Sequence, residues 1–95
     1  MQMNDHQKRL WQSMIDLIDS YLAGTSQDFC STIGKLEGAL DASEIQDKSL
    51  INEWYEFWAP LEIRRAVEGN NTDTKKAIED LTKMKLFLIR HLPEK

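Results

Sequence analysis

Residues 53–65 read EWYEFWAPLEIRR, a stretch in which four aromatic side chains and a proline fall within eight positions and a cluster of charges follows. Trp54, Trp58 and Leu61 recur at spacings of four and three, the periodicity of one face of an α-helix. Pro60 lacks a backbone donor, and its ring clashes with the preceding turn. The stretch therefore predicts a core-facing helix that begins near Lys48 and is kinked or broken near Pro60.

Three further segments carry apolar residues at helical spacing. They run from about Asp5 to Ala23, from about Gln27 to Asp41 and from about Asp73 to Leu92. No run alternates with period two between turn residues, so no strand is predicted. Because short connections favour antiparallel neighbours, residues 1–95 are expected to form one all-α domain, a single up-and-down antiparallel four-helix bundle.

The last helix has a predicted inner and outer side. Its periodicity places Ile78 and Ile89 in the apolar arc, whereas Leu86 and Phe87 project outside it. Two adjacent exposed hydrophobes on a terminal helix could meet a second subunit, and two-fold dimers are the commonest assembly. A homodimer is therefore one hypothesis for this chain.

The second helix contains Gly34 and Gly38, four residues apart. Each costs about 1 kcal/mol relative to alanine in an exposed helix interior. Close approach by a neighbouring helix or by a partner is the expected compensation. Thr25 is the predicted cap at the start of this helix, with Asp28 in the place of the usual glutamate of a capping box.

Composition is that of a folded globular domain, with 41% hydrophobic and 29% charged residues. No window approaches the roughly 20 apolar residues of a membrane-spanning helix, and the first residues lack the pattern of a secretory signal. The single cysteine, Cys30, cannot form an internal disulfide, and a chain with one thiol fits a reducing compartment. Cytoplasmic residence is the resulting expectation.

Charge is unevenly distributed along the chain. Residues 1–62 hold eleven acidic and four basic residues, a net charge of -7, whereas residues 63–95 hold five acidic and eight basic residues, a net charge of +3. Nucleic acids and anionic membranes both require cationic patches, so neither is expected as a partner. A cationic protein is the natural complement.

Recognisable catalytic chemistry is absent from the sequence. The two histidines, His6 and His91, belong to no metal-binding or di-iron motif. The glycines form no phosphate-binding loop, and Cys30 on an apolar face is more typical of an inert core residue than of a nucleophile. We therefore expect a non-enzymatic protein with no catalytic residue, metal ion or cofactor.

Some charges fall where the helical pattern calls for apolar residues. They are Glu37 on the second helix and Glu62 and Arg65 on the third, and a similarly placed Lys85 on the fourth can extend its amine to solvent. One interpretation is a partly buried ion-pair network that fixes helix register. The other is a polar pocket able to receive a cationic side chain or a small ligand, lined by Glu37, Trp54, Trp58, Glu62 and Arg65.

A second candidate surface is acidic. Glu53 and Glu56 lie one helical turn apart, opposite the apolar arc, and Asp16 and Asp19 occupy comparable positions on the first helix. Such a set is often a solvated face. Alternatively, it is an electrostatic docking patch that accelerates association with a cationic partner.

Part of the chain resembles small, uncharacterised, all-helical bacterial proteins, some of which look like toxin-immunity proteins. The resemblance covers residues 14–66 and is carried by LIDSYLAG at 17–24, LEGALD at 36–41, and Trp54, Phe57, Trp58, Leu61 and Glu62. It implies a small acidic binder of a basic toxin. The Asp-Tyr-Tyr-Pro recognition segment of nuclease-colicin immunity proteins is missing, so no binding residue is carried over from that group.

Three functional hypotheses follow. The first is a non-enzymatic acidic protein-binding module, in its narrowest form an immunity protein that neutralises a cationic bacterial toxin. The second is a small-molecule sensor or accessory protein that uses the polar pocket. The third is a structural homodimer.

Overall fold

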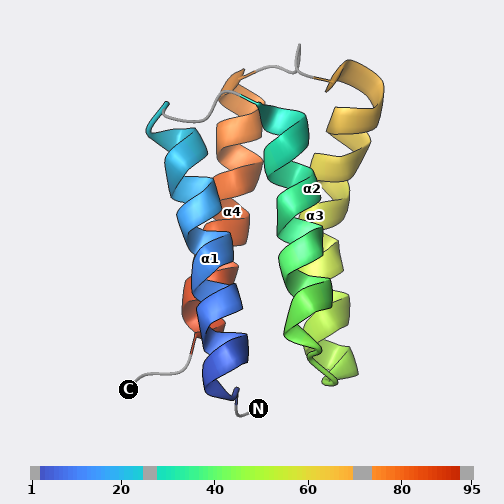
Figure 1. Ribbon diagram of the computed structural model, residues 1–95. Coiled ribbons are helices and arrows are strands. Elements are labelled where there is room, and N and C mark those ends of the chain that lie inside the picture. The colour runs from blue at the N-terminus through green and yellow to red at the C-terminus, as the bar shows by residue number, and fades with distance from the viewer. Residues whose placement is uncertain (1–2, 25–27, 70–73, 93–95) are drawn as a thin grey trace.

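The computed structural model describes residues 3–24, 28–69 and 74–92. Four α-helices account for nearly all of these residues, and no strand occurs among them. They are α1 (Asp5–Leu22), α2 (Phe29–Ser43), α3 (Lys48–Glu68) and α4 (Thr74–His91). The predicted all-α class and the order of the four helices are confirmed (Figure 1).

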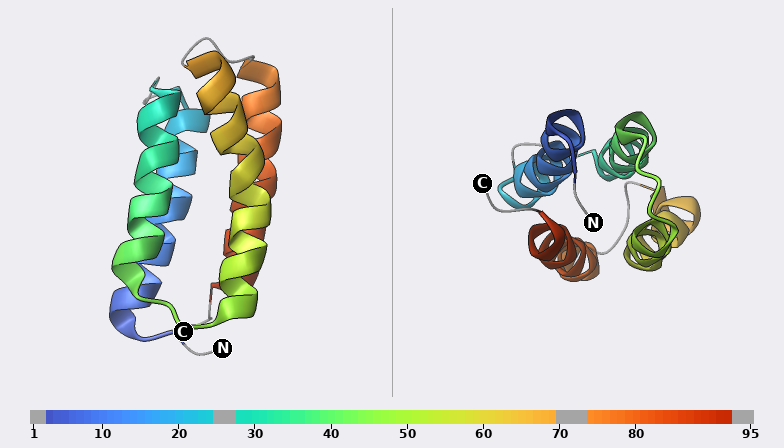
Figure 2. Two further views of the ribbon diagram at one scale, coloured as in Figure 1. Left: turned by 90° about the vertical axis from the view of Figure 1, so that its right-hand side faces the viewer. Right: turned by 90° about the horizontal axis from the view of Figure 1, so that it is seen from below.

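The helices form a ring in which each packs on two neighbours. Contacts join α1 to α2, α2 to α3, α3 to α4 and α4 back to α1. Successive helices run in opposite directions, and the end-on view places α1 diagonally across from α3 (Figure 2). This arrangement is the predicted up-and-down antiparallel four-helix bundle.

Side-chain caps set where three of the helices begin. Asn4, Asp28 and Asp47 each accept a hydrogen bond from the backbone N–H three residues ahead, which satisfies one of the donors that a helix start leaves free. The predicted cap Thr25 lies outside the described residues. Asp28 itself caps α2, because its carboxylate reaches the N–H of Ser31 at 2.9 Å.

Pro60 does not end the third helix. α3 continues through it to Glu68 as one element, so a break at this position does not occur. The missing N–H leaves the carbonyl of Glu56 without its usual donor. Both Pro60 and Glu56 are exposed, so water can solvate that carbonyl while buried Trp58 and Leu61 anchor the helix on its inner side.

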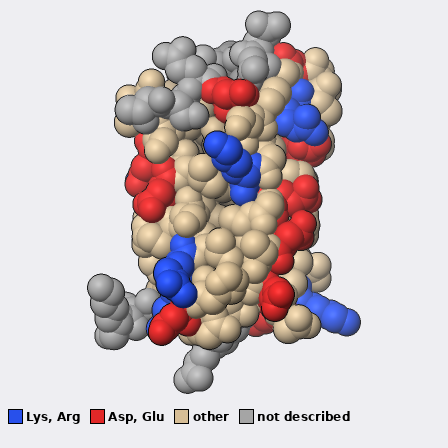
Figure 3. Space-filling view, in the orientation of Figure 1, with Lys and Arg blue, Asp and Glu red and all other residues tan. Residues whose placement is uncertain are grey.

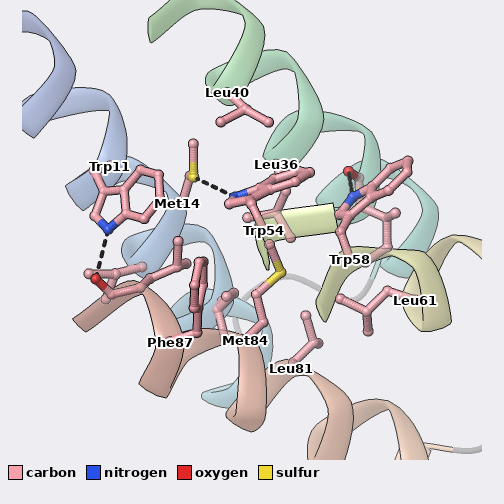
Figure 4. Packing of buried hydrophobic residues seen from close by; sticks show 14 of the residues in the cluster. Trp11, Met14, Leu36, Leu40, Trp54, Trp58, Leu61, Leu81, Met84 and Phe87 are labelled. Atoms are coloured by element: carbon pink, nitrogen blue, oxygen red, sulfur yellow. Dashed lines mark hydrogen bonds between the residues drawn. The ribbon is translucent and has the colours of Figure 1, made fainter. Parts of the chain in front are cut away.

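Three tryptophans tie the core together (Figure 4). The indole N–H of Trp11 donates to the carbonyl oxygen of Leu88 at 2.7 Å, which joins α1 to α4. Trp54 donates to the sulfur of Met14 at 3.4 Å, which joins α3 to α1 across the diagonal. Because a buried donor without a partner is costly, these bonds fix the tryptophans as structural residues.

The fourth helix is rotated relative to the sequence prediction. Phe87, expected outside the apolar arc, is only 2% exposed, whereas Ile78, expected inside it, is 40% exposed. Ile89 is likewise exposed. The ring of Phe87 stacks on Phe57 of α3, with centroids 5.0 Å apart. The apolar arc of α4 is wider than the surface its neighbours cover, and burial favours the larger aromatic side.

Candidate functional site

One edge of the bundle gathers polar side chains from two helices. Here we call it the α2–α3 seam, and its residues are Glu37 and Asp41 of α2 and Tyr55, Glu62 and Arg65 of α3. Trp58 lies at its base and donates its indole N–H to the carbonyl oxygen of Ile33 at 3.2 Å. Figure 3 shows acidic side chains in a column along the edge where α2 and α3 lie side by side.

Tyr55 is at the centre of the seam. Its hydroxyl lies 3.4 Å from Oε2 of Glu37, and its ring packs edge-on against Trp54 and Trp58. Partial burial raises the pKa of Tyr55, and the negative charges of Glu37 and Asp41 raise the pKa further. The phenol therefore stays neutral beside two carboxylates.

Glu62 and Arg65 pair with each other within α3. Arg65 Nε donates to Glu62 Oε2 at 2.7 Å, and a second bond joins Nη2 to Oε1. The hydrogen bond from Arg65 lowers the pKa of Glu62, and the same bond raises the pKa of Arg65. Both side chains are partly exposed, so this pair lies at the rim of the core and not inside it.

The structure brings four of the five predicted pocket residues to this seam. Glu37, Glu62 and Arg65 lie at its surface and Trp58 at its base, while Trp54 is fully buried behind them. The two indole rings stack on each other at 5.7 Å. Their N–H groups are already bonded within the core, so the tryptophans offer packing surface and not an open aromatic wall.

Glu37 and Asp41 have no described cation within ion-pair distance, although the charge of Arg65 acts on Glu37 from farther away. Neither forms an ion pair with any residue that the structure describes, whereas Glu62 is paired with Arg65. Asp41 is exposed and Glu37 partly exposed. The seam thus presents two carboxylates without a direct ion pair next to a phenol hydroxyl, an arrangement suited to a lysine or arginine side chain.

The four acids predicted as one docking surface are not brought together. Asp16 and Asp19 lie on α1, Glu53 and Glu56 lie on α3, and these helices are diagonal in the ring. Asp19 binds Lys85 of α4 at 2.5 Å, which also explains how Lys85 is accommodated. Glu53 lies 3.9 Å from the imidazole of His91. Each pair of acids therefore belongs to a different side of the bundle.

Sequence reasoning missed the role of Asp41 and Tyr55. The periodicity of a single helix does not show which helices become its neighbours. The available signal was that Asp41 lies four residues after Glu37 and so shares its helix face. Because α2 packs on α3, the face that carries Glu37 and Asp41 forms one surface with Tyr55.

Two hollows mark the α3–α4 side of the molecule. One, of about 320 Å³, lies between α3 and α4 and is lined by Phe57, Lys83, Leu86, Phe87 and Arg90. The other, of about 190 Å³, lies on α3 and is lined by Pro60, Ile63, Arg64, Val67 and Glu68. Leu86 is exposed, as the sequence predicts. Both hollows are shallow surface features with apolar floors and charged rims.

Other kinds of site find no support in the described part of the chain. Among residues 3–24, 28–69 and 74–92, no group of histidine, cysteine and carboxylate side chains is placed to hold a metal ion. No helix in the same ranges has the length and apolar character needed to cross a membrane.

Comparison with known proteins adds no relative. No protein-family model, curated protein or solved structure matches the chain.

Proposed function

We propose that this chain is a non-enzymatic, acidic protein-binding module that docks a cationic segment of its partner on the α2–α3 seam. The observation that carries the proposal is the pair of carboxylates, Glu37 and Asp41, neither of which lies within ion-pair distance of a described cation. A partner's lysine or arginine would bond to them, with the hydroxyl of Tyr55 beside it. Charge-assisted hydrogen bonds of this kind are about twice as strong as neutral ones.

Two glycines next to the seam support this location. Gly34 and Gly38 lie on α2, and a Cβ added at either one would meet no atom within 4 Å. The predicted approach of a neighbouring helix is therefore wrong, because nothing in the described chain uses the space. Both positions cost helix stability, and a closely approaching partner would account for that cost.

The charge pattern supports a protein partner over a small ligand. Burial of Trp54 and Trp58 removes the aromatic walls that a small-molecule pocket would use, and a pocket normally encloses most of its ligand. An exposed acidic edge instead steers a cationic protein over long range. Association should then be fast at low salt and slower as ionic strength rises.

The narrowest form of the proposal is a bacterial immunity protein that neutralises a cationic toxin in the cytoplasm. It combines the resemblance of residues 14–66 with the net charge of -4 and the single cysteine. Such a protein acts by covering its target, so it needs a binding surface and no catalytic residue.

The test is affinity capture from the native host with matched charge-reversal variants. The bait is the wild-type chain, and partners are identified at low and at moderate salt. Glu37→Lys with Asp41→Lys should abolish recovery of a basic partner that the wild type retains. The control variant, Asp16→Lys with Asp19→Lys, changes the net charge by the same amount on another side of the bundle. It should still recover most of the basic partner.

Three outcomes count against the proposal. Recovery of no protein partner at either salt concentration contradicts a binding function. Loss of the partner only with the Asp16 and Asp19 variant, or only with reversal of Glu53 and Glu56, moves the docking surface away from the seam. Equal loss with every variant indicates general charge attraction and no specific site.

A further inference from the structure

A strip of apolar side chains lies uncovered on the outer face of α3. Its members are Ala59, Pro60, Ile63, Ala66 and Val67, all exposed, and here we call it the α3 strip. Ile63 is 63% exposed and Val67 is 79% exposed. The strip lies on the opposite flank of α3 from the core, and contiguous apolar surface of this kind commonly marks an interaction site.

The strip is symmetric about Ile63. Ala59 and Val67 lie four residues to either side of it, and Pro60 and Ala66 lie three residues to either side. If a second α3 packs antiparallel with the two Ile63 side chains in contact, each member of one strip therefore faces a member of the other. A two-fold interface requires this kind of self-complementarity, in which one surface patch binds its own copy.

A socket for the opposing side chain already exists on this face. Pro60, Ile63, Arg64 and Val67 follow the i, i+3, i+4, i+7 pattern and surround the hollow of about 190 Å³. Four residues at this spacing form the hole that accepts one knob from a facing helix in knobs-into-holes packing. The small side chains of Ala59 and Ala66 beside it permit close approach of two helix backbones.

The fourth helix is held in a fixed register beside the strip. The rings of Phe57 and Phe87 stack, and Nη2 of Arg64 lies 3.1 Å from Oδ2 of Asp80. Arg64 follows Phe57 by seven positions on α3, and Phe87 follows Asp80 by seven positions on α4. The two helices therefore advance by equal steps in opposite directions between these contacts.

This register makes the charges of α4 complementary under the same two-fold axis. Ile63 precedes Arg64 and Leu81 follows Asp80, and Arg64 pairs with Asp80. Because the two helices are antiparallel, Ile63 and Leu81 lie at the same height along the bundle. Glu79 and Lys83 lie two residues to either side of Leu81, and both are exposed. A two-fold axis at Ile63 places Glu79 of one copy level with Lys83 of the other, twice per dimer. The apolar strip and the charges thus share one centre of symmetry.

We propose that the partner of the α3 strip is a second copy of this chain, packed antiparallel through α3 with the two-fold axis at Ile63. The interface differs from a dimer through Leu86 and Phe87, because Phe87 is buried in the core of its own bundle. It does not depend on the protein-binding proposal for the α2–α3 seam, which lies on another flank of α3. Either proposal can fail without the other.

Sedimentation velocity over a concentration series is the first test. The wild type should show a reversible dimer. Ile63→Glu places two like charges on the axis and should raise the dimer dissociation constant by about a hundredfold or more. Ile78→Glu, at an exposed apolar position on α4, should leave the constant unchanged, and circular dichroism should show native helix content in both variants.

A charge-reversal cycle tests the register. Glu79→Lys and Lys83→Glu should each weaken the dimer, since each puts like charges opposite one another. The double variant restores opposite charges and should return the dissociation constant to within about threefold of the wild type. Two losses without rescue in the double variant contradict this arrangement of the copies.

Cross-linking tests the position of the axis directly. In a Cys30→Ala background, Ile63→Cys should form a disulfide-linked dimer under mild oxidation, because a residue on a two-fold axis meets itself. Ile78→Cys is the control and should remain monomeric. Overturning results are a wild type that stays monomeric up to about 1 mM, a dimer that Ile63→Glu leaves intact, or equal cross-linking at both positions.

Discussion

The two halves of α3 both carry apolar side chains but bury them to different extents. In residues 48–58, Trp54 and Trp58 are buried, and their indole N–H groups donate to Met14 of α1 and to Ile33 of α2. In residues 59–68, Ile63 and Val67 lie on the surface although their side chains are as apolar as core residues. An apolar residue on a helix is buried only where a neighbouring helix covers its side. Apart from buried Leu61, the apolar side chains of the second half therefore form a surface, and their contributions to stability and to binding can be separated by mutation.

The strongest contrast is expected between Trp54 and Ile63. Trp54→Ala should lower the free energy of unfolding by about 3–5 kcal/mol, since it opens a cavity and leaves Met14 without its bonding partner. Ile63→Ala should change it by no more than about 0.5 kcal/mol in the monomer. Urea denaturation at low protein concentration measures both. Similar losses at the two positions would show that the halves of α3 do not differ in this way.

The next largest loss of stability is expected at Phe87, which the rotation of α4 brings into the core. Phe87→Ala should cost about 3–4 kcal/mol because it removes a buried ring that stacks on Phe57. Leu86→Ala, at the adjacent exposed position, should cost less than about 0.5 kcal/mol. Thermal and urea unfolding of the two variants provide the measurement. Equal costs would favour the orientation that the sequence periodicity indicates.

Replacing the exposed glycines of α2 should stabilise the bundle, whereas the substitutions above destabilise it. Gly34→Ala and Gly38→Ala should each raise the free energy of unfolding by about 0.5–1 kcal/mol, since no atom obstructs the new methyl group. If a partner approaches α2 closely, the same two variants should capture less of that partner than the wild type does. Stabilisation with undiminished capture would remove these glycines from the docking surface.

The smallest expected effect concerns the Glu62 and Arg65 pair at the rim. Because Arg65 lowers the pKa of Glu62, the pair contributes stability that is fully present above the ordinary carboxyl pKa. That contribution is lost as pH falls through the lowered pKa. Glu62→Gln should therefore reduce the melting temperature slightly at neutral pH and not in strong acid. Glu56→Gln controls for removal of one charge from α3, and identical profiles for the two variants would contradict the assignment.

Local signals in the sequence predicted most of the fold. Apolar spacing located all four helices. The observed ends of α1, α2 and α4 lie within two residues of the predicted ones, and α3 begins at the predicted residue but continues past Pro60 to Glu68. Asp47 caps α3 through the backbone N–H of Leu50, and capping of this kind depends only on a side chain and the backbone a few residues ahead. Such features need no knowledge of the rest of the chain, so they can be inferred without a structure.

Features that depend on two helices could not be predicted in the same way. Asp16 and Glu53 looked equivalent because each lies opposite an apolar arc, yet they belong to diagonal helices. The rotation of α4 depends on how Phe57 of α3 presents its ring to Phe87. Pairing of neighbours decides both, and periodicity along one helix contains no information about its neighbours.

The sulfur of Met14, which accepts the indole hydrogen bond of Trp54, can report how often the core opens. Met14 is fully buried, so peroxide reaches its thioether only when the bundle unfolds. The sulfoxide that forms is larger and polar and does not suit the site that Met14 leaves. The oxidation rate of Met14 should therefore follow the unfolded fraction, and each oxidation should make refolding of that molecule less favourable.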